Sequence, residues 1–152
     1  FYISGEGFDN SFVIEDEKIN ISVDLKLEIP KTLKKLIEQN NTIVLIYPIP
    51  EQGWNVPNRY FYGKANWGEA VYYPHQVWKE RVLESKLILD SIISEKIVRI
   101  YPENIFCDSF VKNNCVGSFE NDIFYSDDDH LSLVGANLLA KNIIDNIQYL
   151  LD

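Results

Sequence analysis

Residues 42–48 read TIVLIYP and residues 96–102 read KIVRIYP. Each is a short run of β-branched and apolar residues ending at a proline, a pattern typical of a parallel strand covered on both faces. An amphipathic helix is expected before each strand, at residues 29–41 (IPKTLKKLIEQNN) and 75–96 (HQVWKERVLESKLILDSIISEK). Helices that alternate with buried strands predict an α/β fold with a parallel sheet.

The segments around these strands complete the expected organisation. Apolar and polar residues alternate between residues 11 and 27, which predicts a half-buried β-hairpin, and Pro30 is expected at the first position of the next helix. Residues 51–74 read as one long loop rich in Gly, Pro, Asn and aromatic residues, and a final amphipathic helix begins at about Ser132. The second helix carries apolar residues at helical spacing, namely Val77, Leu83, Leu87 and Ile88.

The composition is that of one acidic globular domain. The chain has 152 residues, of which 46% are hydrophobic, and a net charge of -9. No linker or composition break divides it, so residues 1–152 are expected to form part of one domain. The negative charge argues against nucleic-acid binding through a basic patch and against electrostatic docking on anionic lipid. No apolar run approaches the about 20 residues that a membrane helix needs.

Cys107 and Cys115 are the only two cysteines, and the stretch between them is rich in turn-forming residues. Two interpretations are open: a disulfide that bridges a tight loop, or two free thiols. A disulfide would place the domain outside the reducing cytosol. A structural zinc site is not expected, because two thiols are too few and neither lies beside a histidine in the sequence.

Asp127 and His130 form a D-x-x-H pattern directly before the last helix. On a turn, this spacing can bring the carboxylate to one imidazole nitrogen and leave the other free to take a proton from a serine hydroxyl. Asp128 and Asp129 are expected to point elsewhere and to favour the positive end of the helix. The alternatives are a solvated acidic helix start, or a metal site. Asp and His are both metal ligands, but the only other histidine, His75, starts a different helix, and nothing near it in the sequence completes a ligand set.

Three longer stretches resemble one known family. They are residues 44–57 (VLIYPIPEQGWNVP), 98–115 (VRIYPENIFCDSFVKNNC) and 122–140 (DIFYSDDDHLSLVGANLLA). They resemble the SGNH domain fused to the C-terminus of membrane O-acyltransferases that modify bacterial surface polysaccharides. The resemblance runs from about Thr42 to Ile144, and more loosely back to Phe1.

The resemblance implies a three-layer α/β/α, flavodoxin-like SGNH hydrolase fold with a parallel sheet. It also implies that Asp127 and His130 are the Asp and His of a catalytic triad, in which His130 acts as base and then acid and Asp127 orients it. A cysteine pair follows the penultimate strand in that family, which favours a disulfide between Cys107 and Cys115.

The nucleophile of the family does not appear in this chain. It lies in a Gly-Asp-Ser block on the first strand, and no Gly-Asp-Ser occurs here. The SGEG stretch at Ser4 fits neither the order nor the place, and the family's oxyanion-hole Gly and Asn blocks are also not matched. We therefore expect residues 1–152 to be the C-terminal portion of one SGNH domain, without its first strand or strands and inactive alone.

By resemblance, the intact protein transfers an acyl group, with acetyl expected, to a hydroxyl of a cell-surface polysaccharide through an acyl-serine. The acyl donor would be delivered by an upstream membrane domain at the periplasmic or extracellular face of the membrane. No cofactor or metal is implied. The rivals are a secreted SGNH carbohydrate esterase, which uses the same triad with water as acceptor, and a carbohydrate-binding module without catalysis.

Aromatic residues crowd the stretch after the first strand. Aromatic rings can stack on sugar rings, which makes Trp54, Tyr60 and Trp67 candidate substrate-binding residues. A loop that packs on its own aromatic side chains explains the same composition.

Overall fold

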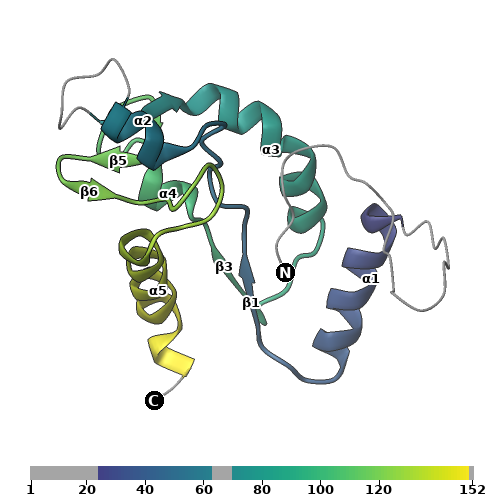
Figure 1. The fold of residues 1–152 in the computed structure, drawn as a ribbon. Coiled ribbons are helices and arrows are strands. Elements are labelled where there is room, and N and C mark those ends of the chain that lie inside the picture. Colours follow the sequence, from purple (N-terminus) through teal and green to yellow (C-terminus); the bar gives the residue numbers. More distant parts are fainter. Residues whose placement is uncertain (1–23, 63–69, 151–152) are drawn as a thin grey trace, which may run out of the picture.

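The computed structural model describes residues 24–62 and 70–150, which form a mixed α/β fold (Figure 1). None of the described helices combines the length and the apolar character needed to cross a lipid bilayer. The elements in chain order are α1 (Leu25–Glu38), β1 (Ile43–Ile46), α2 (Val56–Tyr62), β2 (Tyr72–Pro74), α3 (His75–Asp90), β3 (Ile97–Ile100), α4 (Glu103–Phe106), β4 (Asn114–Val116), β5 (Ser118–Phe119), β6 (Asp122–Ile123), α5 (Leu133–Ile147) and the 3-10 turn η1 (Gln148–Leu150).

The two apolar runs form the expected parallel pair. Strand β1 pairs with β3 in a register that runs from Ile43 opposite Ile97 to Ile46 opposite Ile100. Backbone hydrogen bonds continue the pair at both ends, because Ile43 N donates to Lys96 O at 2.8 Å and Tyr47 N donates to Ile100 O at 2.9 Å. The prediction of a parallel sheet is confirmed for these two strands.

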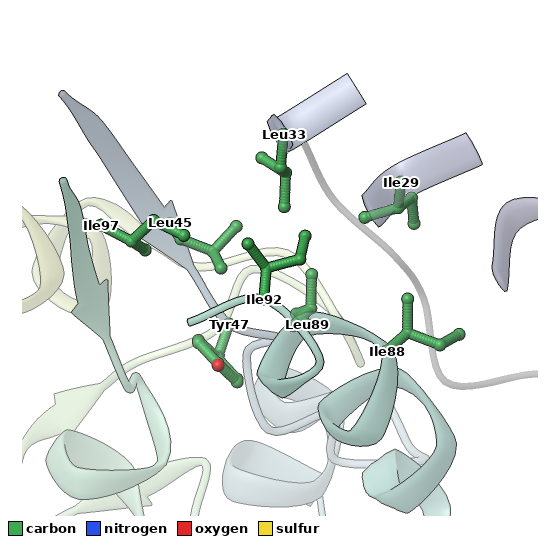
Figure 2. Close-up of a cluster of buried hydrophobic side chains, with 8 residues drawn as sticks. All are labelled: Ile29, Leu33, Leu45, Tyr47, Ile88, Leu89, Ile92 and Ile97. Carbon is green, nitrogen blue, oxygen red and sulfur yellow. The ribbon is translucent and has the colours of Figure 1, made fainter. Parts of the chain in front are cut away.

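Helices cover this pair from two sides. Helices α1 and α3 pack on one face, where their side chains meet those of β1 and β3 (Figure 2), while α5 contacts β3 from the other side (Figure 1). Burial of each large side chain in such a cluster contributes about 1.5–3 kcal/mol. The buried members are Ile29, Leu33, Leu45, Tyr47, Ile88, Leu89, Ile92 and Ile97. The α/β class is confirmed, and the complete three-layer SGNH fold stays a prediction.

Helix α1 begins earlier than expected. The hairpin predicted over residues 11–27 lies outside the described residues up to residue 23, and from Leu25 onward the prediction is wrong. The Asp24 carboxylate accepts a hydrogen bond from Lys26 N at 3.0 Å and caps the helix, so Pro30 lies inside α1 and not at its first position.

The error arose because Leu25 and Leu27 continue the two-residue alternation of the preceding residues, which is the strand period. In the helix, Leu25 instead packs with Ile29, Leu33 and Ile37, which recur every four positions. Leu27, which the strand pattern placed on the same face, is 66% exposed.

The expectation of one long loop over residues 51–74 is also wrong in the described part. The Asn55 side chain accepts a hydrogen bond from Asn58 N at 2.9 Å and starts α2, with Pro57 in its first turn. Strand β2 follows and pairs antiparallel with β4. Asn and Pro are common both in loops and at helix starts, which is why the composition alone indicated a loop.

Helix α3 is confirmed, but it ends at Asp90 and turns a different face inward than expected. Of the four residues proposed for the apolar stripe only Ile88 is buried, whereas Val77, Leu83 and Leu87 are exposed. The buried stripe is His75, Trp78, Val82, Ser85 and Leu89, together with Ile88. Trp78 and Val82 pack against the cysteine pair, a contact that the helical period alone does not reveal.

Cys107 and Cys115 form a disulfide. The two residues also pair as an isolated antiparallel bridge, so the disulfide closes the base of a hairpin. Both are buried against α3. Of the two interpretations left open by the sequence, the structure supports the bridge.

The disulfide is expected to stabilise the domain. Cross-linking a loop with a sequence separation of 8 restricts the unfolded chain and contributes roughly 2–3 kcal/mol on the chain-entropy model. Replacing both cysteines with serine should lower the free energy of unfolding by about this amount in chemical denaturation. The unmodified chain without reductant is the reference, and equal stability of the two proteins would contradict the expectation.

Gly135, near the start of α5, lies against the backbone of the segment before that helix. A Cβ at this position would lie 2.2 Å from the carbonyl oxygen of Phe124, which is backbone and cannot rotate away. We expect Gly135→Ala to destabilise the domain by about 1–3 kcal/mol, as overpacking does. Thermal unfolding measures the effect. The control Asn137→Ala lies on the exposed side of α5 and should change stability little. An unchanged Gly135→Ala midpoint would refute the close contact.

Candidate active site

The acidic loop, residues 126–131, is a closed turn between β6 and α5. Its base is held by an antiparallel bridge between Tyr125 and Leu131. Ser126 N donates to His130 O at 2.8 Å, and Ser132 N donates to Phe124 O at 2.8 Å. Ser132 then caps α5, because its hydroxyl accepts a hydrogen bond from Gly135 N. The expected start of the last helix is confirmed.

Asp127 organises this turn with both carboxylate oxygens. Oδ1 accepts backbone hydrogen bonds from His130 N at 2.7 Å and from Asp129 N at 3.0 Å. Oδ2 lies 2.9 Å from His130 Nδ1. These donors, with the backbone N–H of His130 first, hold the pKa of Asp127 below its usual range. The carboxylate is therefore ionised, and Nδ1 of His130 carries the proton that it accepts.

Asp129 also reaches the imidazole, contrary to the expectation that Asp128 and Asp129 point elsewhere. Asp129 Oδ1 lies 2.8 Å from His130 Nδ1, while Asp128 is exposed. The hydrogen bond and charge of Asp127, followed by the charge of Asp129, raise the pKa of His130. No sequence pattern indicates this contact of Asp129, because neighbouring side chains in a tight turn reach one atom only when the backbone folds back.

The acidic loop is fixed to the segment that follows β1. Gln52 N donates to Asp128 O at 2.8 Å and Val56 N donates to Asp127 O at 2.9 Å. The buried hydroxyl of Tyr125 donates to Pro50 O at 2.6 Å. These contacts place the acidic loop beside residues 50–56. The D-x-x-H spacing also predicts that the far imidazole nitrogen of His130 faces a cleft beside Pro48–Trp54, and this stays a prediction.

The aromatic residues proposed for sugar binding are engaged in packing. The Trp54 ring lies under the Arg59 guanidinium, 4.1 Å from the ring centroid, and meets the Tyr73 ring edge to face. Tyr60 packs against Phe61 and donates its hydroxyl hydrogen to Glu120 O at 2.9 Å. Trp67 lies outside the described residues. Contact of these rings with a sugar stays a prediction.

The two histidines differ in their surroundings. The His130 side chain is 76% exposed, which leaves Nε2 on an open surface. His75 is the first residue of α3, as expected, and is buried, with Nδ1 2.8 Å from Asp108 Oδ2. The hydrogen bond from His75 holds the pKa of Asp108 below its usual range. The sequence missed this pair, because its members are 33 positions apart.

Within residues 24–62 and 70–150, two groups of side chains have the donor atoms of a metal site. Asp127, Asp129 and His130 each offer an atom within 4.8 Å of the others, and their sharing of one N–H accounts for this proximity without a metal. His75 and the two cysteines form the second group, which corrects the expectation that no ligand set lies near His75. Disulfide sulfurs are not thiolates, the form that binds metals.

The pKa of His130 provides a test of the geometry of the acidic loop. Asp127→Asn should lower that pKa most, Asp129→Asn should lower it less, and Asp128→Asn should leave it unchanged. NMR titration of the imidazole measures this in a chain with only two histidines. Because the pKa of His130 is higher in the folded chain than in the unfolded chain, its interaction with the two carboxylates stabilises the fold. This stabilisation is fully present below the unfolded pKa of His130 and is lost as pH rises through the folded pKa. Equal effects of all three variants would contradict the geometry.

Comparison with known proteins identifies the family. A family model described as an SGNH domain fused to AT3 domains matches residues 1–145. No curated protein and no solved structure gives a significant match to the chain. The matched range contains the β1–β3 pair, the disulfide and the Asp127–His130 contact. The chain belongs to the SGNH family, in the group whose members are fused to AT3 acyltransferase domains.

Proposed function

We propose that this chain supplies the acid–base half of an O-acyltransferase that acylates a hydroxyl of a cell-surface polysaccharide, with acetyl as the expected group. The single observation that carries the proposal is the hydrogen bond from His130 Nδ1 to Asp127 Oδ2 at 2.9 Å, in a member of the SGNH family. A carboxylate on one imidazole nitrogen leaves the other nitrogen as a general base.

His130 acts twice in the proposed reaction. Nε2 first takes the proton of a serine hydroxyl as the serine oxygen attacks the carbonyl of the acyl donor, and then gives that proton to the leaving group. In the second half, Nε2 takes the proton of a sugar hydroxyl that attacks the acyl-serine, and returns it to the serine oxygen. Asp127 keeps the proton on Nδ1 throughout and stabilises the imidazolium.

Asp129 also stabilises the imidazolium form of His130. Its carboxylate adds a second negative charge 2.8 Å from Nδ1, which favours the charged imidazole at the moment when Nε2 holds the extra proton. The mechanism uses proton transfer and a covalent acyl-serine only, so it requires no cofactor.

The nucleophile is expected to lie outside residues 1–152, because the chain contains no Gly-Asp-Ser sequence. Fusion to AT3 acyltransferase domains supports delivery of the acyl donor by a membrane partner domain. The disulfide supports a location at the periplasmic or extracellular face of the membrane.

One observation favours the esterase as a second candidate. The His130 side chain is largely exposed, and water can replace the sugar hydroxyl as the acceptor if the acceptor site stays open to solvent. The two reactions share the acyl-serine and differ only in the second half.

Substitutions in the intact fused protein test the proposal. His130→Ala should abolish acyl transfer, and Asp127→Asn should reduce kcat on the order of 10⁴-fold, as a wrongly oriented tautomer does in serine protease triads. Asp128→Asn is the matched control and should retain activity, since this side chain is exposed. Transfer to polysaccharide and release of free acid from a small acyl ester are measured in parallel.

The outcomes distinguish the candidates. Acyl-polysaccharide supports the transferase, free acid alone supports the esterase, and polysaccharide binding without turnover supports a binding module. Residues 1–152 alone should give no turnover, because their serines lack the Gly-Asp-Ser context. Activity of the His130→Ala protein, or hydrolysis by the isolated chain through one of its own serines, would overturn the assignment.

A further inference from the structure

Two arginines of this acidic chain have no carboxylate partner, although the net charge is -9. Arg59 belongs to α2 and Arg81 to α3, and both side chains are exposed. Among the residues that the structure describes, neither guanidinium takes part in a salt bridge. Both are therefore available to an anion that arrives from solvent.

The segment of residues 52–56 runs along the acidic loop. It is fixed there at both ends, because Gln52 N donates to Asp128 O at 2.8 Å and Val56 N donates to Asp127 O at 2.9 Å. The residues between these two donors therefore lie beside the acidic loop. A group bound over them is next to the candidate active site.

Each arginine lies against one residue of this segment. The Arg59 guanidinium lies 4.1 Å from the centroid of the Trp54 ring. A Cβ at Gly53 would lie 3.6 and 3.7 Å from the two terminal nitrogens of Arg81, so that guanidinium lies beside the bare backbone of Gly53. Gly53 is itself exposed, which leaves this part of the surface open to solvent.

An aromatic pair connects the two arginines on the inner side. The Trp54 ring meets the Tyr73 ring edge to face, with a centroid distance of 6.3 Å. Burial raises the pKa of Tyr73, and the positive charge of Arg81 opposes this rise, so Arg81 acts on the ring that packs against Trp54. The negative charge that adds to the rise comes from Glu51, a buried residue.

The arrangement of the guanidiniums suits an anionic ligand. Stacking on Trp54 engages the face of the Arg59 guanidinium, while the N–H groups at its edge remain able to donate hydrogen bonds. Such an edge matches the two oxygens of a carboxylate or phosphate. An anion that approaches His130 is repelled by the aspartates of the acidic loop, and cations beside the loop offset this repulsion.

We propose that Arg59 and Arg81 bind a negatively charged substituent of the acceptor, a carboxylate or a phosphate, so that the polysaccharide acylated by the intact protein is an acidic one. This inference rests on the proposed function. The expected acyl group, acetyl, is neutral, and the negative charge is therefore assigned to the acceptor.

Binding of matched oligosaccharides by the intact fused protein tests this assignment. One pair is tetragalacturonic acid and its carboxyl-reduced form, and the other is a phosphorylated mannan oligosaccharide and its dephosphorylated form. In calorimetry, the protein should bind the charged member of at least one pair about tenfold more tightly, as exposed charge contacts allow. The pair with this preference identifies the substituent. Equal affinity within both pairs, or no binding of any member, would overturn the proposal.

Charge variants of the intact protein assign the preference to the arginines. Arg59→Gln and Arg81→Gln should each reduce it about threefold, and the double variant should remove it, while affinity for the neutral oligosaccharide stays unchanged. Lys34→Gln removes the same charge from an exposed position on α1 and should keep the preference. Retention of the preference in the double variant, or an equal loss of affinity for charged and neutral members, would overturn the proposal.

Two further measurements separate this inference from the proposed function and from the acyl donor. His130→Ala should abolish acyl transfer and keep the binding preference, so an active His130→Ala protein with the preference intact refutes the triad assignment and supports the arginine site. The double arginine variant should hydrolyse nitrophenyl acetate and nitrophenyl succinate in the same ratio as the unmodified protein. A selective loss with the succinate ester would assign the arginines to an anionic acyl group and would overturn the proposal.

Discussion

Backbone hydrogen bonds between the segment after β1 and the acidic loop fix the position of the candidate site. Gln52 N and Val56 N donate to Asp128 O and Asp127 O, and the hydroxyl of Tyr125 donates to Pro50 O. Val56 and Tyr125 both belong to the aromatic cluster that also contains Phe106 and Phe124. Because these donors and acceptors are largely main-chain atoms, the position of the acidic loop is set by the path of the backbone.

The two histidine–carboxylate pairs illustrate two uses of the same interaction. His130 and Asp127 are three residues apart in an exposed turn, where the imidazole keeps one nitrogen open to solvent. His75 and Asp108 come from distant parts of the chain and lie where a helix start meets a hairpin. The first arrangement suits proton transfer to a group that arrives from outside, and the second suits the joining of two elements.

The parts of the fold that could be predicted from sequence are those decided by local chemistry. The two apolar runs ending at prolines predicted β1 and β3, and the Ser132 cap predicted the start of α5. The start of α1 was missed because Leu25 and Leu27 continue a two-residue alternation, although only Leu25 packs on the core. The buried face of α3 was missed because contact with the cysteine hairpin, and not helical periodicity, decides which side of that helix is covered.

The candidate site likewise has one part that depends on local sequence and one that depends on packing between distant segments. Asp127 and His130 could be paired from a spacing of three, since a turn brings such residues together. The second carboxylate at Nδ1 and the histidine beside the disulfide depend on how the backbone folds back and on long-range packing. Neither leaves a pattern in a single sequence.

The turn around Asp127 has a consequence for how an active domain assembles. The hydrogen bonds of the Asp127 side chain span three residues at most, so forming them closes a very short loop at small entropic cost. The backbone hydrogen bonds from Gln52 and Val56, which come from a distant segment, then fix the turn in place. The Asp127 carboxylate and the His130 imidazole are therefore expected to pair locally and to pack against the rest of the domain together. Substitutions elsewhere in the domain are therefore expected to change the position of a hydroxyl relative to His130 Nε2 before they change the hydrogen bond between Asp127 and His130 Nδ1.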